Sequence, residues 1–198
     1  MSRSRSHQGA AALAAALCFS PGANAAADVP QKAQVCVACH GAAGNSTDAA
    51  EPSLAAQPAQ FVATQLYFFR EGNRKDPQMS PMASSLSNAE MNELAAYFAK
   101  QPPVPAPHRT SPENLTEGRR LAEQHHCVQC HGAKLLGLQH IPRLAGQQAA
   151  YLKTQLYAFK ARTRADLDGT MTSAAQPLSE KDIDVLADYL SGIDPRRD

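Results

Sequence analysis

A five-residue pattern, Cys-x-x-Cys-His, occurs twice in the chain, at residues 36–40 and again at residues 127–131. Side chains three and four positions apart lie on the same face of a helix. The two thiols of each pattern therefore reach the two vinyl groups of one haem while the histidine turns its imidazole onto the iron, as in c-type haem attachment. The sequence predicts two covalent haem c groups, with thioethers at Cys36, Cys39, Cys127 and Cys130 and iron ligands at His40 and His131.

Paired cysteines have two other common uses, a structural zinc site and disulfide bonds. Zinc knuckles usually place their Cys-x-x-Cys pairs within ~20 residues of each other. Here the second pattern starts at Cys127, 91 residues after Cys36, and a histidine follows both pairs. The spacing favours haem over zinc or disulfides, and it indicates a duplicated unit.

The first 27 residues have the features of a secretory signal peptide. Arg3 and Arg5 precede an apolar run over residues 9–19, and Ala-x-Ala cleavage patterns end at Ala25 and Ala27. An uncleaved membrane anchor is the alternative, but an apolar run of about 11 residues is too short to cross ~30 Å of hydrocarbon as a helix. We predict an exported, periplasmic protein without an integral membrane segment after cleavage, and peripheral association with a membrane stays open.

The charge balance argues against one class of partner. The chain has 19 Lys and Arg against 18 Asp and Glu, and removing residues 1–27 takes away Arg3 and Arg5 and no acidic residue. Nucleic-acid binding needs a concentrated basic face, which this balance does not favour. The sequence therefore predicts protein partners and no nucleic acid.

The duplication extends beyond the paired cysteines. Residues 52–57 read Pro-Ser-Leu-Ala-Ala-Gln, and residues 142–147 read Pro-Arg-Leu-Ala-Gly-Gln. Thr-Gln-Leu-Tyr occurs at residues 64–67 and again at residues 154–157, each time within apolar residues at helical spacing. The chain therefore contains two copies of one unit.

Each unit ends in an amphipathic helix with a marked start. Ser87 and Glu90 match a capping box, and Ser179 with Asp182 gives a weaker version of it. Apolar residues follow both caps at helical spacing, and no stretch shows sustained strand alternation. The sequence predicts an all-α fold.

Residues 101–107 read Gln-Pro-Pro-Val-Pro-Ala-Pro and cannot continue a helix, because four of the seven are proline. Such a segment is expected to run extended as a semi-rigid spacer. The predicted organisation is a signal peptide over residues 1–27, an N-terminal domain over 28–101, a Pro-rich linker over 102–110 and a C-terminal domain over 111–198.

The second axial position of each iron decides its chemistry. An open position allows oxygen or peroxide chemistry, whereas a methionine closes the iron and raises its reduction potential. Met171 lies seven residues before Leu178, and Met79 lies seven residues before the matching Leu86. We predict Met79 and Met171 as the axial ligands, with Met82 as the alternative in the first unit.

A histidine that binds a metal usually donates its other ring N–H to an acceptor, which fixes the tautomer and the ring orientation. Pro52 and Pro142 lie 12 and 11 residues after His40 and His131. Their carbonyl groups are the candidate acceptors, and the alternative is that these prolines only shape a turn.

These features together resemble class I c-type cytochromes, and specifically the dihaem cytochrome c4 family. The resemblance covers residues 32–192 and rests on the two haem patterns with their following glycines, the Pro-x-Leu-Ala-x-Gln segments, the Gln-Leu-Tyr helices and the Met-then-Leu-Ser ends. It implies two tandem class I cytochrome c-like domains that face each other, with haem propionates near the interface. It also implies a periplasmic carrier between a bc-type complex and a terminal oxidase or reductase. The N-terminal domain departs from the family in its first helix, which few residues are left to form.

Two other functions compete with that of an electron carrier. One is an electron-accepting subunit of a periplasmic dehydrogenase, such as flavocytochrome c sulfide dehydrogenase. The other is an enzyme, either a dihaem peroxidase or a thiosulfate dehydrogenase, which would need an iron that is open or differently ligated. The methionines at matching positions argue against an enzyme, so the sequence predicts a carrier without catalytic residues.

Overall fold

The computed structural model describes residue 1 and residues 31–196, so the predicted signal peptide, its cleavage sites and Cys18 lie outside the described residues. The described chain is helical, which confirms the all-α prediction. Its β pairing amounts to an isolated bridge between Leu138 and Ile141. Among the described residues, the helices are all too short or too polar to cross a membrane.

The first half of the chain is built around the first haem pattern. Its α1 ends at His40, so both cysteines lie in the helix that carries the histidine. The predicted capping box starts α4: the Ser87 hydroxyl accepts from the Glu90 N–H, and the Glu90 carboxylate accepts from the Ser87 N–H. The elements are α1 (Gln31–His40), the 3-10 helix η1 (Ala42–Gly44), α2 (Ala59–Arg70), α3 (Met79–Ala83) and α4 (Asn88–Ala99).

The second half repeats this plan with a separate helix before the haem pattern. Gly118 of α5 lies against Tyr189 of α9, where an added Cβ would come within 2.2 Å of the tyrosine Cβ, so the two helices cross in close contact. The Ser179 capping box is complete in both directions, which makes it stronger than the sequence predicted. The elements are α5 (Pro112–Gln124), α6 (Cys127–His131), α7 (Ala149–Lys160), α8 (Thr170–Ala175) and α9 (Glu180–Ser191).

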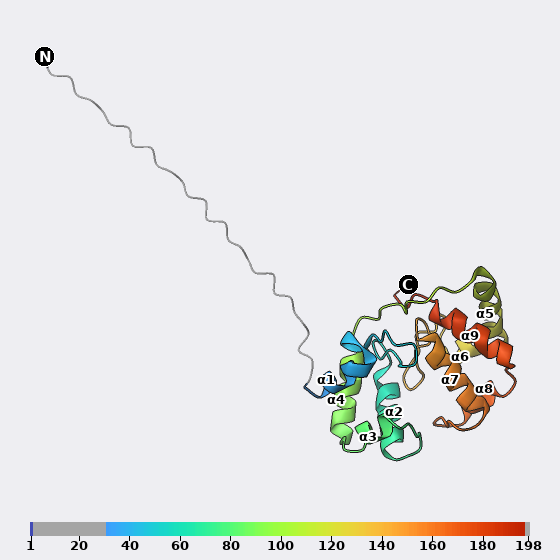
Figure 1. Cartoon of the computed structure of the whole chain (residues 1–198), viewed down its shortest axis with the longest axis horizontal. Helices are drawn as coiled ribbons and strands as arrows, with labels where there is room; N and C mark the ends of the chain where they lie inside the picture. Colours follow the sequence, from blue (N-terminus) through green and yellow to red (C-terminus); the bar gives the residue numbers. More distant parts are fainter. Residues whose placement is uncertain (2–30, 197–198) are drawn as a thin grey trace.

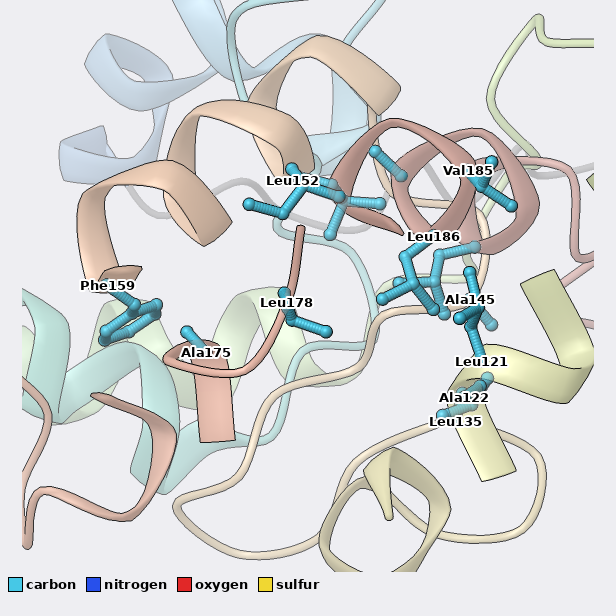
Figure 2. Packing of buried hydrophobic residues seen from close by; sticks show 13 residues of the cluster. Leu121, Ala122, Leu135, Ala145, Leu152, Phe159, Ala175, Leu178, Val185 and Leu186 are labelled. Atoms are coloured by element: carbon cyan, nitrogen blue, oxygen red, sulfur yellow. The ribbon is translucent and has the colours of Figure 1, made fainter. Parts of the chain in front are cut away.

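Each half has its own apolar core. In the first half, α4 contributes the predicted stripe, and Ala33 of α1 is buried in the same cluster. In the second half, α9 packs against α5 and α7, and Figure 2 shows the buried residues that these helices share with the loops. Two separate cores mean that the chain folds as two domains, which lie side by side with α1–α4 in one and α5–α9 in the other (Figure 1).

The linker between the domains has no helix from Gln101 to Thr110, as its prolines predict. It is nevertheless bonded to both domains. The Asn45 side chain donates to the Pro102 carbonyl at 3.1 Å and accepts from the Val104 N–H at 2.7 Å. At the other end, His108 Nε2 lies 2.5 Å from Asp188 Oδ1. The Pro-rich linker is therefore hydrogen-bonded to a domain at each of its ends.

The domains meet through the two Pro-x-Leu-Ala-x-Gln segments. The Gln57 side chain bonds to the N–H and the carbonyl of Arg143, both at 3.0 Å. The Gln147 side chain bonds in the same way to the N–H and the carbonyl of Ser53, at 2.7 and 2.9 Å. Because Gln57 matches Gln147 and Ser53 matches Arg143 in the repeat, the interface has approximate two-fold symmetry.

Candidate haem sites and the interface between them

Both pattern histidines are buried and held by a proline carbonyl. His40 Nδ1 donates to the Pro52 carbonyl, and His131 Nδ1 donates to the Pro142 carbonyl, each at 2.8 Å. A carbonyl can only accept, so Nδ1 carries the proton and Nε2 presents its lone pair to a metal. No described residue is hydrogen-bonded to either Nε2. The prediction that Pro52 and Pro142 orient the histidines is confirmed.

Burial keeps the second histidine in the form that binds iron. Removal from water lowers the pKa of His131, and the hydrogen bond to Pro142 offsets this only in part. The neutral imidazole is therefore the stable form near pH 7, and neutral imidazole is the metal ligand.

The four pattern cysteines are free thiols, so the disulfide alternative is not realised. In each pair the first thiol is half-buried and the second is exposed. Burial raises the pKa of Cys36 and of Cys127, each of which packs against the core of its domain. Within the described chain, His, Cys, Asp and Glu side chains form no group of three or more that would hold a metal ion such as zinc.

The two predicted axial methionines lie in equivalent surroundings. The Met79 N–H donates to Asp76 Oδ1 at 2.8 Å, and the Met171 N–H donates to Asp166 Oδ2 at 2.7 Å. Both methionine side chains are partly buried against the core of their domain, whereas the Met82 side chain is 46% exposed. The shared aspartate bond favours Met79 over Met82, and the ligand assignment stays a prediction.

A polar cluster at the boundary between α2 and α7 was not predicted from the sequence. Arg74 donates to Gln65 at 2.8 Å, to Gln155 at 3.0 Å and to the Tyr151 hydroxyl at 3.2 Å. Arg164 donates to Gln155 at 2.7 Å and to Gln65 at 3.1 Å. The sequence signal was present, because the arginines are 90 residues apart, as the glutamines are.

The charges in this cluster act on one another. Burial lowers the pKa of Arg164 to about 10. Burial alone would raise the pKa of the Tyr151 phenol, but the charges of Arg74 and Arg164 outweigh it, and the net pKa is lowered. The cluster therefore carries an excess of positive charge.

A third arginine, Arg143, also bridges the two domains. Arg143 is 1% exposed, and burial lowers its pKa to about 10. Its guanidinium donates to the Ala55 carbonyl of the first domain at 2.9 Å and to the Ala145 carbonyl of its own. Arg143 thus binds the loops of both domains together through neutral acceptors.

These donors fit haem c in each domain. In each domain a helix presents two free thiols and an oriented imidazole, and a methionine lies against the same core. When bound, each haem supplies a one-electron Fe(III)/Fe(II) couple. Two helical domains with such donor sets define a dihaem c-type cytochrome.

Comparison with known proteins supports this class. The family model described as "Cytochrome c" matches residues 115–194, and the one described as "Cytochrome C oxidase, cbb3-type, subunit III" matches residues 24–98. Cytochrome c4 of Thiocapsa roseopersicina is 37% identical over 170 residues, which cover 80% of this chain and 87% of that protein. The thiosulfate dehydrogenase electron acceptor of Thiomonas intermedia (strain K12) is 37% identical over 193 residues, covering 91% and 88%.

A solved structure agrees with these relatives. The crystal structure of reduced recombinant cytochrome c4 from Pseudomonas stutzeri aligns with a TM-score of 0.76 and 31% identity, over 82% of this chain and 95% of that one. The chain belongs to the dihaem cytochrome c4 family. It carries two covalently attached haem c groups in two tandem cytochrome c domains, and it transfers electrons between redox partners.

Proposed function

We propose that the protein is a periplasmic electron carrier without enzymatic turnover of its own. The observation that carries the proposal is the equivalence of the two sites, each with an oriented histidine and an aspartate-held methionine. With Met79 and Met171 as sixth ligands, neither iron has an open position for thiosulfate or peroxide. The chain then stores and relays single electrons, and the reactions occur on its partners.

The residues around each site have defined tasks. The Pro52 and Pro142 carbonyls hold the imidazole rings in one orientation, so that Nε2 of His40 and of His131 would be the atom that binds the iron. Methionine ligation raises the reduction potential. The apolar cores keep water away from the side chains around each site, so that the surroundings change little when the charge changes.

Two kinds of electron donor are consistent with the relatives. The resemblance to the cytochrome c4 family, to which relatives of that name belong, implies a bc-type complex as donor and a terminal oxidase or reductase as acceptor. The relative named thiosulfate dehydrogenase electron acceptor favours a dehydrogenase as donor. The second candidate is thus an electron-accepting partner or subunit of such a dehydrogenase, to which this chain supplies the haems and the partner supplies the catalytic site.

Purified holoprotein tests the absence of turnover. We expect no sustained oxidation of thiosulfate and no sustained reduction of peroxide by the cytochrome alone. Rapid reduction should appear when a thiosulfate dehydrogenase and thiosulfate are added, or when a reduced bc-type complex is added. Sustained turnover by the cytochrome alone, after free haem and contaminating enzymes are removed, would show that the protein is an enzyme.

Export is tested on the same preparation. The mature protein from periplasmic expression should begin after Ala25 or Ala27, and its mass should exceed that of the polypeptide by two haem groups. A chain that retains residues 1–27 and sediments with the membrane would contradict cleavage and favour an anchor.

A further inference from the structure

Two arginines meet across the domain boundary and share the same acceptors. Each guanidinium is hydrogen-bonded to Gln65 of the first domain and to Gln155 of the second. Each also lies over a phenylalanine ring of its own domain, Arg74 over Phe69 and Arg164 over Phe159, both at 4.5 Å from the ring centre. This arrangement fixes both cations in place at the boundary between the domains.

No described carboxylate is hydrogen-bonded to either guanidinium. The acceptors are two neutral amide oxygens and the Tyr151 hydroxyl, whose pKa the two arginines lower. Arg164 is only 8% exposed, and its Nε is sealed from water without any partner. Even with the Tyr151 phenol ionised, two guanidinium cations would face one anion, so the cluster keeps an excess of positive charge, which is unfavourable in a buried site.

The acidic side chain that acts on Arg164 does not balance this charge. Asp166 acts on Arg164 electrostatically, but its carboxylate oxygens accept from the Met171 N–H and from the N–H and hydroxyl of Thr172. The proximity of Arg74 further lowers the pKa of Arg164, because like charges oppose each other. An anion from outside the polypeptide would satisfy both cations.

The two haem c groups bring such anions, since each haem carries two propionates. The arginines also lie on the segments that lead to the predicted axial methionines. Arg74 lies two residues before Asp76, which holds Met79, and Arg164 lies two residues before Asp166, which holds Met171. Each cation therefore lies on the segment that carries its own domain's predicted methionine ligand, and it contacts the other domain.

We infer that Arg74 and Arg164 form a single counter-charge, shared between the domains, for the propionates of both haems. Positive charge near a haem favours its reduced form, because reduction removes one positive charge from the iron. A shared pair therefore raises both reduction potentials together. The inference deepens the proposed carrier function and rests on it, because it describes how the two electron-carrying sites are held at related potentials.

The test is spectroelectrochemical titration of the holoprotein, resolved into two one-electron components. In Arg74→Gln and in Arg164→Gln, we expect both components to move to lower potential. At a fixed applied potential, the reduced-to-oxidised ratio of each haem should fall about tenfold, which corresponds to about 59 mV for a one-electron couple. Arg164→Lys keeps the charge and should restore most of the shift.

Lys75→Gln is the matched control, because it removes the same charge one residue from Arg74, at an exposed position. It should leave both potentials unchanged. Arg74 is only half-buried, so Arg74→Gln remains informative if Arg164→Gln does not fold. A shift confined to the haem of the substituted domain would overturn the shared counter-charge, and no shift in either haem would overturn the role toward propionates.

The counter-charge inference and the carrier proposal can be tested separately, and either one can fail while the other holds. The potentials are measured on the cytochrome alone, without a donor or acceptor protein. If partners fail to reduce the wild-type protein but both potentials fall in the variants, then the carrier proposal fails and the counter-charge remains. If partner reduction is rapid but the variants keep wild-type potentials, the counter-charge fails and the carrier remains.

Discussion

The side-chain amide of Gln147 pairs with both backbone groups of Ser53, which lies 94 positions earlier in the chain. It accepts from the Ser53 N–H at 2.7 Å and donates to the Ser53 carbonyl at 2.9 Å, as a neighbouring strand would. Both residues are buried, with exposed fractions of 3% and 2%. The pair therefore replaces water for two backbone groups at the domain boundary, and Gln57 does the same for Arg143.

We expect Gln147→Ala to destabilise the holoprotein by about 2–4 kcal/mol, because two buried backbone groups lose their partners. Gln57→Ala should cost a similar amount, since it makes the symmetric pair. Chemical denaturation followed by circular dichroism measures both. Gln129→Ala, at an exposed position on α6, is the control and should stay within about 0.5 kcal/mol of the wild type. Equal stability of Gln147→Ala and the control would show that the pair does not hold the domains.

The axial ligands are tested by the sulfur-to-iron charge-transfer band of the oxidised protein. Met171→Ala and Met79→Ala should each remove about half of the band's intensity, because each substitution leaves one iron without its methionine ligand. Met82→Ala should leave the band intact, since that side chain is largely exposed. A halved band in Met82→Ala with an intact band in Met79→Ala would reverse the assignment in the first domain.

The aspartates that hold the methionine helices give a separate test. Asp166→Ala removes the acceptor for the Met171 N–H, the Thr172 N–H and the Thr172 hydroxyl. We expect a loss of about 1–2 kcal/mol in stability and a weaker charge-transfer band, because α8 loses its starting contacts. Asp168→Ala is the control, since the exposed Asp168 carboxylate accepts from the Thr170 N–H at 3.0 Å, whereas the Met171 N–H donates to Asp166. A band of normal intensity in Asp166→Ala would exclude a positioning role.

The capping box of α9 predicts a pH dependence of stability. Hydrogen bonds from Ser179 lower the pKa of Asp182 below its usual value near 4. A carboxylate with a lowered pKa stabilises the fold above its unfolded pKa, and this contribution is lost as the pH falls through the lowered folded value. Ser179→Ala should therefore cost about 1 kcal/mol at neutral pH and progressively less below about pH 4.

Thermal unfolding of Ser179→Ala and wild type across that pH range measures the difference. Ser111→Ala removes the hydroxyl that accepts from the Asn114 N–H at the start of α5 and serves as the comparison. The Ser111 hydroxyl also lowers the pKa of Glu113, so the contribution of this cap should weaken on acidification in the same direction. A Ser179→Ala deficit that grows on acidification would have the wrong sign and would contradict the box.

Much of the candidate site could be predicted because the residues that form it lie close together in the sequence. Two thiols and a histidine within five residues lie together on a short helical segment, and this does not depend on where that helix packs in the fold. Pro52 and Pro142 follow their histidines after short loops of similar length, so the hydrogen bonds to their carbonyl groups could be predicted as well. The capped helices were equally visible, except that the short Asp182 side chain completes its box more fully than the sequence predicted.

By itself, the sequence determined that this protein has two copies of a helical unit, each able to bind one haem, because attachment, capping and amphipathic spacing all depend on neighbours within a few turns. Only the tertiary structure decided what joins the copies. Gln65 and Gln155 look like solvent-facing helix residues, and Arg74 and Arg164 look like loop cations, until the domains bring them within hydrogen-bond distance. Contacts between residues about 80 to 100 positions apart leave no periodic signal, because they depend on how two folded surfaces meet rather than on local spacing.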